Sequence, residues 1–144
     1  MTIHSRIAAC AATAILAVAC ASSPSKSPTL YDRLGGERVV RAVADDTIDR
    51  SATDPRTARS FKDTKLSRVK EKLAEQICEL AGGPCKYTGD PMKEVHKGLR
   101  NTDAEFNLLV QFLRDALDRA GVGTAEKNEL LRLLAPMKRD IVTG

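Results

Sequence analysis

Apolar residues recur every three or four positions along almost the whole chain after residue 29, which is the spacing of helices that each bury one face. The stripe is clearest at Leu66, Val69, Leu73, Ile77 and Leu80. No segment alternates apolar and polar residues in the manner of a half-buried strand, and no internal repeat is present. The sequence therefore predicts an all-α domain, which we assign to residues 30–142.

Glycine and proline divide this pattern into separate helices. A helical stretch within residues 30–52 is closed by Asp54-Pro55, because the residue before a proline avoids helical geometry. A second helix is expected to begin near Asp63-Thr64, where either side chain can cap the first free amides. It should stop at Gly82-Gly83-Pro84.

The second half of the chain predicts one short helix and two longer ones. Pro91 marks the first turn of the short helix, and a capping box from Thr102 to Glu105 opens the longest helix. The last helix begins near Thr124 and should kink or end early at Pro136. The side chains expected to be buried by the two longer helices are Phe106, Leu109, Val110, Leu113, Leu117, Leu130, Leu134, Met137 and Ile141.

The first 29 residues have the composition of a targeting segment followed by a tether. Arg6 precedes an apolar run over residues 7–19 that is short for a bilayer span and suits a signal peptide. The small residues directly before Cys20 resemble the lipobox of bacterial lipoproteins, in which that cysteine is lipidated. We predict a signal peptide at 1–19, a Ser/Pro-rich tether at 20–29, and an exported lipoprotein anchored in a membrane, on the periplasmic side or at the cell surface. The alternative is an ordinary secretory signal cleaved near Ala21.

The composition argues against nucleic acid as a partner. The formal net charge of +4 is small, and the charges of both signs are mixed along the chain. Three phenylalanines, two tyrosines and no tryptophan leave no aromatic platform on which bases could stack.

Two of the four cysteines, Cys78 and Cys85, belong to the predicted domain. In an oxidising compartment they could form a disulfide across the Gly-Gly-Pro turn, or they could remain separate thiols. No Cys-x-x-Cys-His motif for covalent haem attachment is present. Two cysteines with one histidine lack the fourth ligand of a common zinc site.

His96 is the only histidine outside the predicted signal peptide, because His4 lies within it. It is therefore the only imidazole with which the mature protein could bind a transition metal. A lone histidine near a helix end is usually just exposed, so its neighbours decide how it is interpreted. It follows Gly82-Gly83-Pro84 and Tyr87-Thr88-Gly89 at a short distance, an arrangement that resembles the proximal side of a haem pocket.

A set of short motifs runs in order from Leu30 to about Val142. The set comprises Leu30-Tyr31-Asp32-Arg33-Leu34-Gly35-Gly36, Asp54-Pro55, Phe61, Gly82-Gly83-Pro84, Tyr87-Thr88-Gly89, Met92, His96 and Ala135-Pro136. In this order and spacing the motifs resemble group I truncated haemoglobins over nearly the whole domain. The resemblance implies a two-over-two helical sandwich around a b-type haem.

The resemblance also implies which residues hold the haem. His96 matches the proximal histidine, which coordinates the iron as a neutral imidazole. Phe61 matches the phenylalanine that packs on the porphyrin face. The other positions expected to contact the haem are Leu66, Val69, Lys72, Leu73, Tyr87, Met92, Phe106 and Leu109.

The distal side departs from the family pattern. Ile48 stands where a tyrosine that donates a hydrogen bond to oxygen is usual, and Leu73 stands in place of a glutamine, one turn beyond Val69. Each lost donor forfeits ~1–3 kcal/mol, because oxygen gains negative charge on binding. Gln76 and Thr47 remain as polar groups, although a Thr47 hydroxyl can instead bond to its own helix. We therefore expect weak retention of oxygen and largely intact binding of carbon monoxide.

Lys72 leaves a second possibility open. It directly precedes Leu73, at a position from which some members of the family supply a histidine or lysine as a sixth iron ligand. A lysine ligates only as the neutral amine, so burial would have to lower its pKa. The alternatives are a surface lysine or one that pairs with a haem propionate.

The expected function is reversible binding of a diatomic gas, namely oxygen, carbon monoxide or nitric oxide, with oxygen transport as the family role. Oxidation of nitric oxide is an extension that would need an unidentified reductase. The first alternative is a six-coordinate haem redox or electron-transfer protein with Lys72 as distal ligand. The second is a helical interaction domain that has lost haem and retains the fold.

Overall fold

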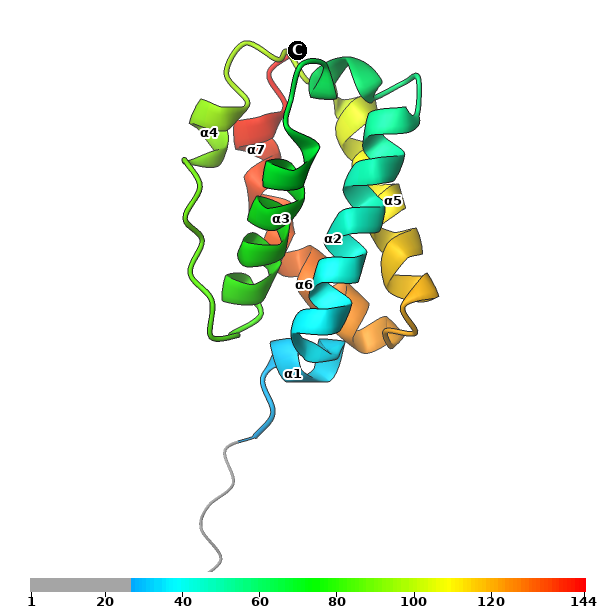
Figure 1. Ribbon diagram of the computed structural model, residues 1–144, viewed down its shortest axis with the longest axis vertical. Coiled ribbons are helices and arrows are strands. Elements are labelled where there is room, and N and C mark those ends of the chain that lie inside the picture. Colours follow the sequence, from blue (N-terminus) through cyan, green and yellow to red (C-terminus); the bar gives the residue numbers. More distant parts are fainter. Residues whose placement is uncertain (1–26) are drawn as a thin grey trace, which may run out of the picture.

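The computed structural model describes residues 27–144 (Figure 1). The predicted signal peptide, Cys20 and most of the predicted tether lie outside the described residues. The helices are α1 (Leu30–Leu34), α2 (Gly36–Thr53), η1 (Ala58–Phe61), α3 (Leu66–Leu80), α4 (Met92–Val95), α5 (Asp103–Arg119), α6 (Thr124–Leu134), η2 (Ala135–Met137) and α7 (Lys138–Ile141). Over residues 27–144 the only β-type contact is an isolated bridge between Asn101 and Val142. Within the same range, no helix combines the length and the apolar character that a membrane span requires.

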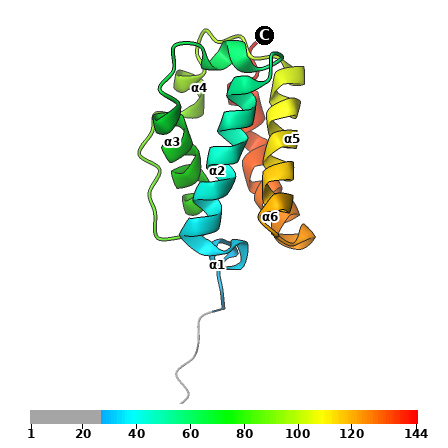
Figure 2. The same cartoon turned by 45° about the vertical axis from the view of Figure 1, so that its right-hand side comes forward.

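The four long helices form two antiparallel pairs. α2 and α3 run in opposite directions and pack together, while α5 runs opposite to α6 (Figures 1 and 2). α2 also packs along α5, so it connects the two pairs. α1 closes one end of the bundle, and α4, η1 and the C-terminus lie toward the other (Figure 1). The all-α prediction is confirmed for the described residues.

The buried core lies toward the end of the bundle that α1 closes. It is formed by α1, the first half of α2, the second halves of α3 and α5, and Leu130 of α6. The least exposed apolar side chains in it include Leu130, Ile77 and Val43. Each such side chain contributes roughly 1.5–3 kcal/mol by leaving water. This half of the molecule therefore has a complete core of its own.

Several side chains predicted to be buried are only partly so. Leu113, Leu117 and Leu130 are buried as expected. The prediction of burial is wrong for Phe106, Leu109, Val110, Met137 and Ile141, which are only half-buried. Leu134 is also half-buried, but it packs against the core. The α5 members of this group precede Phe112, on the half of the helix that lies away from the main core. Their exposure concentrates apolar surface toward the α4 end.

Two helix boundaries agree with the capping predictions. The Thr102 hydroxyl accepts a hydrogen bond from the Glu105 amide at 3.3 Å, and the Glu105 carboxylate accepts one from the Thr102 amide at 2.8 Å. These two bonds are the predicted capping box, and they begin α5. α6 ends at Leu134, and Pro136 lies in the 3₁₀ turn that follows. The early end of the last helix at this proline is therefore confirmed.

The predicted cap of α3 is wrong. α3 begins at Leu66 with Lys65 as its N-cap, and no side chain caps it. Asp63 has φ of 60°, a left-handed conformation, whereas an N-cap needs extended geometry. The Thr64 hydroxyl instead donates to the Lys62 carbonyl at 3.3 Å. The predicted start of the short helix is also wrong by one position. Pro91 is the N-cap of α4, and the first helical residue is Met92.

Cys78 and Cys85 form a disulfide with a Cα–Cα distance of 5.8 Å. This separation lies in the usual range for a disulfide, so the bond needs no backbone adjustment. Of the two alternatives that the sequence left open, the structure has the disulfide. It attaches the loop that leads toward α4 to the last turn of α3.

Candidate haem site

His96 caps the C-terminal end of α4 and is half-buried. Its ring Nδ1 lies 2.8 Å from the Met92 carbonyl oxygen, one turn earlier in the same helix. Because a carbonyl only accepts hydrogen bonds, Nδ1 must carry the hydrogen and donate it. In the neutral imidazole, the lone pair is then on Nε2. A neutral imidazole whose second nitrogen donates to a backbone carbonyl is the usual form of a metal-bound histidine.

Apolar side chains from several elements surround this end of the bundle. Those that the sequence assigned to the haem are Phe61 on η1, Leu66, Val69 and Leu73 on α3, Met92 on α4, and Phe106 and Leu109 on α5. All of them are half-buried, whereas the core residues are below a tenth exposed. α4, η1, the start of α3 and the start of α5 all lie toward the end of the bundle opposite α1 (Figures 1 and 2). A flat apolar group with one metal ligand fits such a set of side chains, and a porphyrin is such a group.

The distal wall is aliphatic. Ile48 is only 3% exposed and lies on α2, outside the main core cluster. Thr47 is fully buried, and its hydroxyl donates to the Val43 carbonyl at 2.7 Å. That donor is therefore engaged in its own helix, the outcome anticipated for a helical threonine. Gln76, half-buried one turn beyond Leu73 on the same helix face, is the remaining amide among the predicted distal residues.

Lys72 makes close polar contacts beside this wall. Its ammonium lies 2.8 Å from a Glu75 carboxylate oxygen and 2.6 Å from the Thr88 hydroxyl. The Lys72 ammonium and the Thr88 amide together lower the pKa of Glu75 to about 2, so this carboxylate is charged. Neither partner of Lys72 was predicted from the sequence. The three-residue spacing from Lys72 to Glu75 on one helix was the signal that could have found the first of them.

Tyr87 can contribute its ring to the haem site, because its hydroxyl already has a hydrogen-bond partner. The hydroxyl donates to the Asp90 carbonyl at 2.8 Å, and burial raises the pKa of the phenol. The Tyr87 amide donates to the Glu79 carboxylate at 3.3 Å. A Cβ at Gly89 would clash with the Tyr87 phenol, so a larger residue there would require this ring to move.

The helical turn that carries Phe61 is fastened to the segment between α4 and α5. Arg59 donates to the carbonyls of Leu99 and Arg100, both at 2.8 Å, and to the Glu105 carboxylate at 2.6 Å. These contacts, together with the capping box, lower the pKa of Glu105 to about 2. Because the partners are about 40 residues apart, no local sequence pattern predicted them. They fix Phe61 relative to the chain that follows His96.

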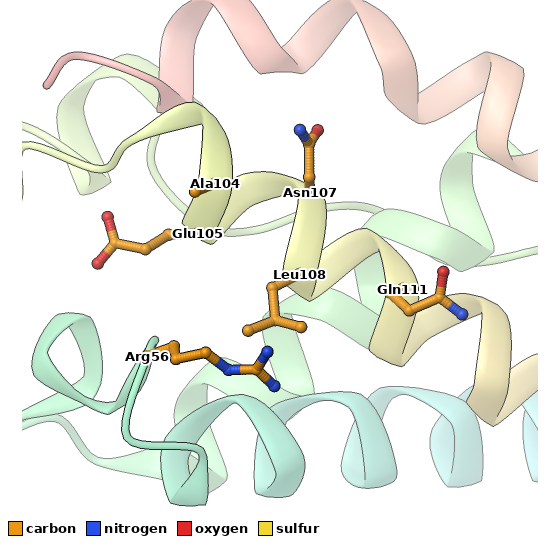
Figure 3. A pocket seen from close by; sticks show the side chains of 6 residues that line it. All are labelled: Arg56, Ala104, Glu105, Asn107, Leu108 and Gln111. Carbon is orange, nitrogen blue, oxygen red and sulfur yellow. The ribbon is translucent and has the colours of Figure 1, made fainter.

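A cavity of about 430 Å³ lies between Arg56 and the first half of α5 (Figure 3). It contains none of the residues that the sequence assigned to the haem. Its charged groups already have partners, since Arg56 pairs with Asp54 at 2.7 Å and Glu105 pairs with Arg59. We therefore assign the site to the α4 end and not to this cavity.

Comparison with known proteins identifies the family of the chain. The family model described as bacterial-like globin matches residues 29–143. The chain belongs to this globin family. A group 1 truncated haemoglobin of Mycolicibacterium paratuberculosis is 37% identical over 116 residues, covering 81% of this chain and 85% of the relative. Another, from a Nostoc species, is 30% identical and covers 79% of this chain and 97% of the relative.

Solved structures confirm the fold of this globin. The Fe(III) form of the truncated haemoglobin from Tetrahymena pyriformis is 27% identical, with a TM-score of 0.76, and covers 81% of this chain and 100% of that chain. A 2/2 haemoglobin from a Synechococcus species is 21% identical, with a TM-score of 0.73, and covers 80% and 98%. The predicted two-over-two sandwich and the resemblance to group I truncated haemoglobins are therefore confirmed. Haem is the cofactor that the family implies.

Proposed function

We propose that this globin binds a diatomic gas reversibly at a b-type haem. The observation that carries the proposal is the hydrogen bond from His96 Nδ1 to the Met92 carbonyl, because it selects the tautomer of the neutral imidazole in which Nε2 has the lone pair that can bind a metal. His96 would hold the haem iron, and the iron would supply the group that binds the gas. Phe61, Met92 and Phe106 supply apolar surface for the porphyrin.

The distal residues determine which gas is retained. Ile48 and Leu73 provide no donor, and the Thr47 hydroxyl is already bonded to Val43. Oxygen gains negative charge on binding and depends on donors, at ~1–3 kcal/mol for each hydrogen bond. Carbon monoxide depends on donors much less. We therefore infer rapid loss of oxygen and firm binding of carbon monoxide, with Gln76 as the one amide able to moderate the difference.

The contacts of Lys72 favour gas binding over the redox alternative. Its ammonium is engaged by Glu75 and Thr88, so ligation would require it to leave both and to lose a proton. Oxidation of nitric oxide, with a reductase as partner, stays a prediction.

Absorption spectra of the haem-loaded protein test the proposal. Wild type should show a five-coordinate ferrous spectrum that converts fully with carbon monoxide. His96→Ala should lose that spectrum, and added imidazole should restore it, because free imidazole can take the place of the missing side chain. Failure of wild type to bind haem in a one-to-one ratio would refute the proposal. A spectrum unchanged in His96→Ala would refute the assignment of the ligand.

We further propose that the globin is exported and anchored to a membrane through a lipid on Cys20. The support is the apolar run over residues 7–19 and the small residues that precede this cysteine. The mass of the protein extracted from membranes tests it. Retention of residues 1–19, or an unmodified Cys20, would refute the anchor.

A further inference from the structure

α3 presents three different faces to its surroundings. The first is buried in the core and consists of Ala74, Ile77 and Cys78. The second is the distal face, which consists of the aliphatic Val69 and Leu73 and the amide Gln76 at helical spacing. The third is polar and faces the loop after Gly83, through Lys72, Glu75 and Glu79.

The third face and the loop are joined by contacts that we call the α3–loop clamp. The clamp consists of the Cys78–Cys85 disulfide, the Glu79 contacts with Lys86 and the Tyr87 amide, the Glu75 contacts with Thr88, and the Lys72 contact with Thr88. Glu75 accepts hydrogen bonds from both the amide and the hydroxyl of Thr88, each at 2.9 Å. The loop runs back along α3: Cys85, Lys86 and Tyr87 meet Cys78 and Glu79, whereas Thr88 meets Glu75 and Lys72, which come earlier in the helix. It thereby holds the distal helix against the loop that leads to the proximal histidine.

Lys72 lies on the border between the distal face and the clamp. Three residues before it is Val69 on the distal face, and three residues after it is Glu75 in the clamp. Its side chain is 18% exposed, so the ammonium depends on Glu75 and Thr88 more than on water. The long, flexible stem of a lysine could also direct the amine toward the distal face.

We propose that Glu75 is the positioning residue that keeps the Lys72 amine away from the sixth coordination position of the haem iron. Glu75 touches Lys72 and Thr88 and has no contact with the iron ligand. It acts in two ways, by pairing with the ammonium form, which cannot ligate, and by fixing the Thr88 hydroxyl as a second acceptor. The inference rests on the gas-binding function proposed above.

The test compares Glu75→Gln with wild type, both loaded with haem and reduced. Glutamine keeps the shape and an acceptor for Thr88 but removes the carboxylate charge 2.8 Å from the Lys72 ammonium; the Glu71 carboxylate, 3.9 Å from that ammonium, remains in both proteins. We expect a six-coordinate, low-spin ferrous spectrum in Glu75→Gln that returns to five-coordinate when Lys72→Met is added. If the amine occupies the site nine-tenths of the time, the apparent affinity for carbon monoxide falls about tenfold.

Glu79→Gln is the matched control, because Glu79 belongs to the clamp but has no contact with Lys72. It should remain five-coordinate. A six-coordinate spectrum in this control as well would overturn the proposal, since it would show that a loosened loop is enough. A five-coordinate spectrum in Glu75→Gln with unchanged affinity for carbon monoxide would also overturn it, while leaving gas binding intact. Absence of haem from wild type would instead refute the gas-binding function, and this inference with it.

A second readout needs no haem. In Glu75→Ala, the Thr88 amide loses its acceptor, so its hydrogen exchange in the haem-free protein should become faster while that of the Tyr87 amide, bonded to Glu79, changes little. Unchanged exchange at Thr88 would mean that Glu75 does not hold the loop, and would overturn the proposal.

Discussion

Reduction of the Cys78–Cys85 disulfide should lower the free energy of unfolding by about 2.4 kcal/mol. The two cysteines are separated by 7 residues, and closing a loop of that length in the unfolded chain corresponds to about 2.4 kcal/mol at 25 °C. In the folded protein, Glu79 and Glu75 hold the same loop through separate hydrogen bonds. The native loop should therefore stay in place after reduction, and the effect should fall on the unfolded chain. For a domain of this length the melting temperature should fall by about 10 °C.

Urea unfolding followed by circular dichroism measures this difference on oxidised and reduced wild type. Cys85→Ala is the control, because Cys85 is half-buried whereas Cys78 is only 1% exposed and its replacement would leave a cavity. The control should unfold at the same urea concentration with and without reductant. Peptide mapping verifies which sample contains the bond. Equal unfolding midpoints for oxidised and truly reduced wild type would refute the reasoning, because the bond would then not restrict the unfolded chain.

Three further outcomes follow from single contacts. Glu105 has a pKa of about 2 in the fold against roughly 4.3 in an unfolded chain. Its ionised form therefore stabilises the fold above pH of about 4.3, and this stabilisation is lost as the pH falls toward 2. In Glu105→Gln, the free energy of unfolding should depend less steeply on pH in this range, as measured by circular dichroism. Thr102→Ala removes the α5 cap and should cost about 1 kcal/mol in urea unfolding, and no loss would contradict the role of the capping box. Leu73→Gln adds a donor at a half-buried distal position and should slow oxygen dissociation about 5- to 150-fold in stopped flow, as ~1–3 kcal/mol for one hydrogen bond implies.

The helices were predictable because their causes are local. Spacing of apolar residues located α3, the capping box located the start of α5, and Pro136 ended α6. The start of α3 was wrong because Asp63 adopts a left-handed conformation, which side-chain capping preferences do not reveal. Burial was also misjudged along the first half of α5, since periodicity identifies an apolar face but not what that face contacts.

The contacts that arrange the candidate site were not predictable from local patterns. Lys72 bonds to Thr88, 16 residues later, and Arg59 bonds to Leu99 and Arg100, about 40 residues later. Such pairs depend on the path of the loops, which the fold determines. The identity of His96 as the candidate ligand came instead from elimination and resemblance, and its hydrogen bond to Met92 now gives a physical reason for it.

The position of the main core bears on how the haem ligand can be tested. The buried cluster lies toward the α1 end and includes neither His96 nor the half-buried haem-side residues such as Phe61. Removing the His96 side chain therefore leaves that core intact, so haem-free wild type and haem-free His96→Ala should have the same melting temperature. Haem bound to the native state adds stability in proportion to the logarithm of its concentration over its dissociation constant. Added haem should consequently raise the melting temperature of wild type more than that of His96→Ala. An equal rise in both proteins would show that the porphyrin is held by apolar contacts alone, without the proximal ligand.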